Sequence, residues 1–63
     1  MHVFSVGGVE YRMRAVESLD GLPVVVVGTL VLVRDSGDLE TNRKIAITAV
    51  EKVRALPEKC TPA

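Results

Sequence analysis

The segment "LPVVVVGTLVLVRD", residues 22–35, decides the fold of this 63-residue chain. Between Pro23 and Arg34, every residue except Gly28 and Thr29 is Val or Leu. Valine favours strands, and the run is much shorter than the roughly 20 apolar residues of a membrane-spanning helix. The sequence therefore predicts a strand over 24–33 that is apolar on both faces, and no association with a membrane.

Two dipeptides mark turns in the residues before this strand. Gly-Gly at 7–8 and Asp-Gly at 20–21 both tolerate the positive φ angles of two-residue hairpin turns. They predict three consecutive antiparallel strands at residues 2–6, 9–17 and 24–33.

The two turns also fix a register. The first pairs Val6 with Val9 and Phe4 with Tyr11, and the second pairs Ala15 with Val26. Directly opposed residues share a face of the sheet, so a single expected core face collects Phe4, Val6, Val9, Tyr11, Met13, Ala15, Val26, Leu30 and Leu32.

A helix is expected over residues 39–56, because apolar residues recur there at helical spacing and Pro57 ends the pattern. Ser36 or Asp38 is suited to cap its first turn. The fold class is thus α+β, a three-stranded antiparallel meander with one C-terminal helix packed on one face. We expect residues 1–57 to form one domain and residues 58–63 to form a disordered tail.

One helix covers one face of the sheet, which leaves the other face of strand 24–33 open. The residues expected there are Val25, Val27, Thr29, Val31 and Val33. Soluble monomers generally avoid such an apolar strip, especially on an edge strand. A domain of this size is also marginally stable alone, and oligomerisation is one device that compensates. We therefore expect a homo-oligomer, most simply a dimer, assembled through strand 24–33.

Several arrangements satisfy this expectation. The strand pairs with its two-fold mate at the edge, or two sheets stack through their valine faces. Two arrangements would remove the need for a second copy. Strand 24–33 is then central in the sheet, or it bends at Gly28 and closes a small barrel.

Composition excludes several classes of site. Eight Lys and Arg balance eight Asp and Glu, and there is one His and one Cys. A structural zinc site needs four ligands, and a disulfide needs two cysteines. No nucleophile, phosphate-binding or calcium-loop motif is present, so we expect no catalytic residue, no cofactor and no metal. An enzyme using His2 or Tyr11 across subunits ranks last.

Basic residues suggest a second role. Arg12 and Arg14 project from one face of strand 9–17, and Arg34, Arg43 and Lys44 lie near the junction of strand and helix. These five residues are the candidate contacts with a partner protein or with nucleic acid. The zero net charge and the lack of exposed aromatic residues count against nucleic acid.

The expected function is that of a small non-enzymatic interaction or regulatory protein acting as a homo-oligomer. The alternative is a nucleic-acid-binding regulator that uses Arg12 and Arg14. The N-terminal residues do not resemble a secretory signal, and the lone thiol of Cys60 suits a reducing compartment. The expected location is therefore the cytoplasm.

Overall fold

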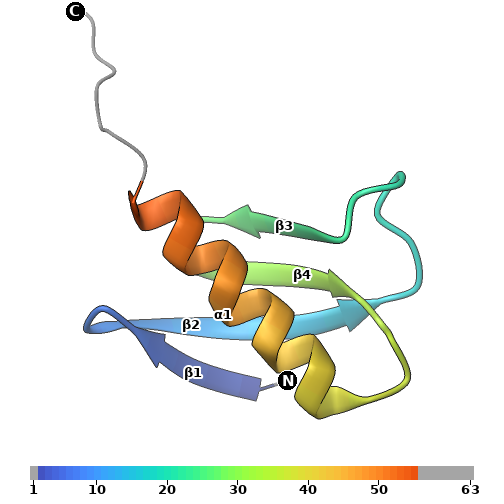
Figure 1. Cartoon of the computed structure of the whole chain (residues 1–63), viewed down its shortest axis with the longest axis horizontal. Helices are drawn as coiled ribbons and strands as arrows, with labels where there is room; N and C mark the ends of the chain where they lie inside the picture. Colours follow the sequence, from blue (N-terminus) through green and yellow to red (C-terminus); the bar gives the residue numbers. More distant parts are fainter. Residues whose placement is uncertain (1, 56–63) are drawn as a thin grey trace, which may run out of the picture.

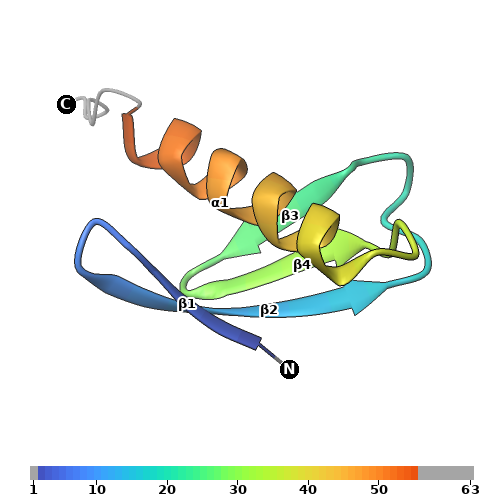
Figure 2. The same ribbon diagram turned by 60° about the horizontal axis from the view of Figure 1, so that its bottom comes forward.

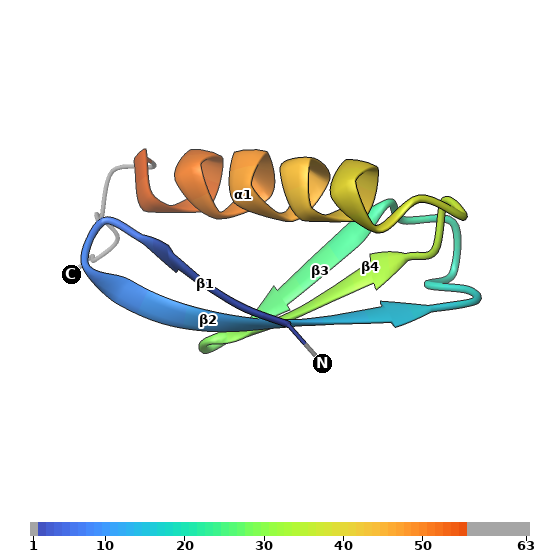
Figure 3. The same ribbon diagram turned by 90° about the horizontal axis from the view of Figure 1, so that it is seen from below.

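A computed structural model describes residues 2–55, which form four strands and one helix (Figures 1 and 2). The elements are β1 (His2–Val6), β2 (Val9–Val16), β3 (Val24–Val27), β4 (Leu30–Arg34) and α1 (Leu39–Ala55). The strands form one sheet in the order β1-β2-β4-β3, and α1 lies across one face of it (Figure 3). The α+β class is confirmed, but the expected three-stranded antiparallel sheet is wrong, because the sheet has four strands and is mixed. Cys60, the expected tail at 58–63 and the end of the predicted helix lie outside the described residues.

The first hairpin has the predicted register. Val6 pairs with Val9, Phe4 with Tyr11, and His2 with Met13. The turn residues Gly7 and Gly8 have φ angles of 60° and 82°, a left-handed conformation that glycine adopts at little cost. The Gly-Gly dipeptide therefore fixed both the turn and the pairing.

The apolar segment is not one strand, because it reverses direction at Gly28 and Thr29. Gly28 has a φ of 58°, and Val27 pairs with Leu30 across this two-residue turn. The segment is thus a hairpin of β3 and β4. The prediction of a single strand over 24–33 is wrong because it treated Gly28 as a position within a strand rather than as a turn.

The second hairpin joins the first in an unexpected way. β4 pairs parallel with β2, so that Met13 lies opposite Val31 and Ala15 lies opposite Val33. The Asp20–Gly21 turn does form, with both residues at positive φ. It belongs, however, to a connection that carries the chain past the position of β4 to the far edge of the sheet. The predicted antiparallel pairing of 9–17 with 24–33 is therefore wrong, and β3 is the edge strand.

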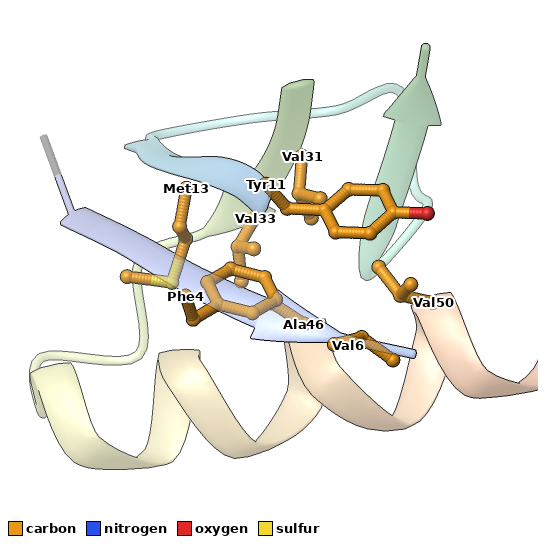
Figure 4. Packing of buried hydrophobic residues seen from close by; sticks show 8 residues of the cluster. All are labelled: Phe4, Val6, Tyr11, Met13, Val31, Val33, Ala46 and Val50. Atoms are coloured by element: carbon orange, nitrogen blue, oxygen red, sulfur yellow. The ribbon is translucent and has the colours of Figure 1, made fainter. Parts of the chain in front are cut away.

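The core lies between the sheet and α1 (Figure 4). Its buried apolar residues are Phe4, Val6, Tyr11, Met13, Val31, Val33, Ala46 and Val50. The strand residues predicted for β1 and for Tyr11 and Met13 are confirmed. Leu30 and Leu32 were assigned to this core wrongly, because the turn at Gly28 changes which residues of β4 face the helix. Ala15 was also assigned to it wrongly, because it pairs with Val33 on the helix side of the sheet but is exposed near the end of β2.

Candidate interaction surfaces

The face of the sheet opposite α1 is called here the outer face, and within residues 2–55 no helix lies over it (Figure 3). Side chains alternate along each strand, and the buried residues Val31 and Val33 face the helix. Their neighbours in sequence therefore face outward. The register places Val25 beside Leu32 and Val27 beside Leu30. We call these four residues the outer apolar block.

Exposure within this block is uneven. Val27 is 59% exposed, whereas Val25, Leu30 and Leu32 are partly buried by their neighbours. The block differs from the strip expected from sequence. Val31 and Val33, assigned to the oligomer interface, are 0% exposed within their own chain, since they lie beneath α1. Their assignment to an outer surface is wrong, and the same change of direction at Gly28 brings Leu30 and Leu32 to that surface instead.

Thr29 occupies the turn between β3 and β4 and is exposed. Its carbonyl oxygen accepts a hydrogen bond of 2.9 Å from the backbone N–H of Arg12. This bond extends the pairing of β2 with β4 into the turn. Thr29 therefore holds one end of the outer apolar block against β2.

Arginine side chains border the block on β2. Arg12 pairs with Leu30 and Arg14 with Leu32, and both arginines are exposed. A hollow of about 470 Å³ opens beside them, lined by Val3, Glu10, Arg12, Arg14, Thr29 and Leu30. Arg34 alternates with the buried Val33 and so shares the outer face. The surface thus combines apolar side chains, three cations and the carboxylate of Glu10.

The other two predicted contact residues lie elsewhere. Arg43 and Lys44 belong to α1, in the opposite layer of the domain. Arg43 lines a hollow at the β1 side of the helix, together with His2 and Glu40. The structure therefore does not bring Arg43 and Lys44 together with Arg12 and Arg14, and the five basic residues do not form one surface.

Lys44 belongs to a second surface, which sequence reasoning missed. A groove of about 360 Å³ runs between α1 and the start of β3, and we call it the helix-edge groove. It is lined by Val24, Lys44, Ile45, Thr48, Ala49 and Lys52. Within the part of the chain that the structure describes, its charged lining residues are both lysines. The helical spacing of Ile45, Ala49 and Lys52 was visible in the sequence, but the position of β3 beside them was not.

A polar cluster joins β4 to α1, and Asn42 is its centre. The Asn42 side chain is 1% exposed, although it lies in the first turns of the helix. Its Oδ1 accepts hydrogen bonds from the Ser36 backbone N–H at 3.0 Å and from the Ser36 hydroxyl at 2.7 Å. Its Nδ2 donates to Asp35 at 3.2 Å. Within residues 2–55, no buried side-chain polar atom lacks a partner, so this cluster is satisfied by its own members.

Two carboxylates of the cluster are stabilised in their charged form. The Gly37 N–H and the Asn42 amide donate to Asp35 and lower the pKa of its carboxyl. The Thr41 hydroxyl and backbone N–H donate to Asp38 and lower the pKa of that carboxyl. The Thr41 N–H bond makes Asp38 the N-cap of α1, as one of the two predicted candidates. These contacts connect the end of β4 to the start of α1, and they indicate a structural role rather than a binding site.

The residues considered for catalysis do not meet. Tyr11 is buried and stacks on Phe4 with ring centroids 6.0 Å apart, while His2 is exposed at the start of β1. Among the described residues, no three His, Cys, Asp or Glu side chains gather closely enough to hold a metal ion.

Comparison with known proteins adds no functional information. The described part of the chain contains no helix that is long and apolar enough to cross a membrane. No protein-family model matches the chain, and no curated protein or solved structure is significantly similar to it.

Proposed function

We propose that this chain is a small non-enzymatic interaction protein that acts as a homodimer, with the outer face of β3 and β4 as its contact surface. The observation that supports this proposal is the outer apolar block. It comprises Val25, Val27, Leu30 and Leu32 on adjacent strands, without a helix to cover it. Removing apolar surface from water contributes about 25 cal/mol per Å², so covering the block favours association.

The surroundings of the block also suit a protein contact. A stable interface needs about 800 Å² on each partner, which is more than four side chains offer. Arg12 and Arg14 extend the surface, and arginine is enriched in protein interfaces. In a two-fold dimer both copies use the same surface, so each copy presents both its arginines and its Glu10 to the other. The carboxylate of Glu10 thus provides a partner for an arginine of the second copy.

Stacking of two sheets is favoured over pairing at the β3 edge. Edge pairing would bring Lys44 and Lys52 of one copy toward the same lysines of the other, because these residues flank that edge. Like charges placed together oppose association. Stacking through the outer face leaves both lysines away from the contact.

The test compares two valines of similar exposure. Val27 on the outer face is 59% exposed, and Val53 on α1 is 51% exposed. Sedimentation velocity over a range of protein concentrations gives the dimerisation constant of each variant. Val27→Lys should shift the chain to monomer, whereas Val53→Lys should leave the dimer intact. A wild-type chain that is monomeric at high micromolar concentration refutes the proposal, as does an equal effect of the two substitutions.

A second candidate function is nucleic-acid binding, which the shared outer-face position of Arg12, Arg14 and Arg34 favours. Such binding should weaken steeply with salt and with each arginine replaced. Anisotropy of labelled duplex and single-stranded DNA at low and moderate salt tests it. The dimer proposal expects no such binding. Salt-sensitive affinity lost in Arg12→Ala and Arg14→Ala would favour the second function instead.

A further inference from the structure

We infer that the edge of β3 and the helix-edge groove together bind an extended acidic segment of a partner protein, which adds as an antiparallel strand beside β3. This inference depends on the proposed interaction role. It does not depend on the dimer, because the groove lies on the helix side of the sheet and the outer apolar block lies on the other side.

The first argument is the outward-facing backbone of the edge strand. The Arg34 N–H donates to the Pro23 carbonyl at 3.2 Å, so Pro23 is bonded toward β4. In an antiparallel pair such bonding recurs at every second residue, so Val25 and Val27 also bond toward β4. The N–H and C=O groups of Val24 and Val26 therefore point away from the sheet. A strand added here would satisfy them.

The second argument is that the groove lies where side chains of an added strand would go. Val24 and Val26 pack against the core from the helix side of the sheet. Residues of a new strand directly opposite them point to the same side. These side chains would enter the groove beside Ile45 and Ala49, while the alternate side chains would point to the outer face.

The third argument is charge. Lys44 and Lys52 line the groove, no acidic residue among those at 2–55 lines it, and the side chains between the lysines are Ile45, Thr48 and Ala49. The two lysines are eight residues apart on α1, which is about 12 Å along the helix axis. An extended chain covers about 13 Å in four residues. The fitting segment therefore has carboxylates at positions i and i+4 and a small apolar residue at i+2.

The probe is the labelled peptide Ser-Glu-Thr-Val-Thr-Glu-Ser, titrated with the full chain and followed by fluorescence anisotropy. Backbone amide shifts in ¹⁵N spectra should move at Val24 and Val26 and along the lysine side of α1. Lys44→Glu should weaken binding about tenfold, because it replaces an attraction with a repulsion. The matched control Arg43→Glu makes the same charge change on the other side of the helix and should leave the affinity within about twofold.

N-methylated peptides test strand addition without altering the protein. In the antiparallel arrangement, the N–H groups of the two glutamates and the valine face β3, and those of the threonines face away. Methylation of the first set should abolish binding, and methylation of the threonines should preserve it. Absence of binding by the unmodified peptide, equal loss in both methylated sets, or shifts confined to Arg12 and Arg14 would overturn the inference.

The dimer proposal and this inference fail separately. The Val27→Lys variant should be monomeric and still bind the peptide. A wild-type monomer that binds the peptide refutes the dimer alone, whereas a dimer that ignores the peptide refutes the groove alone.

Discussion

Asn42 offers the sharpest test of how α1 is held to the sheet. Replacing it with alanine removes three side-chain hydrogen bonds, two from Ser36 and one to Asp35. Each hydrogen bond contributes about 0.5–1.5 kcal/mol net, and the Ser36 N–H then lacks its partner. We expect Asn42→Ala to lower the free energy of unfolding by about 2–3 kcal/mol. Globular proteins have a total stability of about 0.05–0.15 kcal/mol per residue, so the expected loss is a large part of the total stability of this chain.

The assay is urea denaturation followed by circular dichroism of the helix. With a slope of about 1 kcal/mol per M, the midpoint should fall by about 2–3 M. Thr48→Ala is the control, because Thr48 is exposed on the same helix and its loss should change stability by less than about 0.5 kcal/mol. The double variant Ser36→Ala/Asn42→Ala should be less damaging than the sum of the two single variants, since they share a bond.

Asn42→Asp gives the reasoning a second, independent check. The aspartate keeps an acceptor for Ser36 but places a carboxylate beside the carboxylate of Asp35. Burial and this like charge raise the pKa of the new group, so its penalty grows as the pH rises from about 4 to about 7. A midpoint for Asn42→Ala within about 0.5 M of the wild type would refute the role of the cluster. A penalty for Asn42→Asp that is independent of pH would refute the assigned contact with Asp35.

Two further predictions concern acid stability and the direction of the β4 side chains. The pKa values of Asp35 and Asp38 are lowered in the folded chain. The stability that these two carboxylates contribute is therefore complete above the ordinary aspartate pKa of about 3.9, and it is lost as the pH falls through their lowered pKa values. Asp38→Asn keeps a capping oxygen without the charge, so its urea midpoint should change less between about pH 5 and about pH 2.5 than that of the wild type. An equal change of the midpoint in the variant and the wild type would contradict this. Val31→Ala should cost about 1.5–3 kcal/mol and Val27→Ala less than about 0.5 kcal/mol, measured at low protein concentration so that association does not contribute. Similar costs for the two substitutions would contradict the turn at Gly28, because a single continuous strand would place Val27 and Val31 on the same face.

Local signals in the sequence predicted the local parts of this fold. The Gly7–Gly8 turn specified the first hairpin and its register, and the helical spacing with Asp38 as cap specified α1. The segment 24–33 carried less information. Its residues are apolar on both faces, so the alternation that would show a change of direction at Gly28 is absent.

The pairing of β2 with β4 depends on a contact between distant residues, and no short pattern encodes it. It is favoured because β4 then lies under α1, where Val31 and Val33 are fully buried. One alternative from the sequence placed strand 24–33 in the centre of the sheet. This is correct for its second half, β4, which is central, but not for its first half, β3, which is at the edge. The residues of the candidate site also divide into those that local sequence patterns predicted and those that depend on long-range pairing. Val25, Val27, Arg12 and Arg14 were placed on the outer face from alternation, while Leu30, Leu32 and the helix-edge groove required the topology.

Asn42 was missed for a different reason. A polar residue in an amphipathic helix is usually assigned to the solvent side. Its burial follows from the loop before the helix, which folds back to donate to it. The sequence signal was the group of Asp, Ser and Gly residues at 35–38 just before it.

The parallel contact between β2 and β4 divides the molecule into two pieces that are each continuous in sequence. One piece is the hairpin of β1 and β2, and the other contains β3, β4 and α1, with the connection 17–23 between them. Each piece has its own short-range contacts, so the slow event in folding should be the docking of one piece on the other. A cut within 17–23 would therefore leave two fragments whose reassembly reports that docking directly.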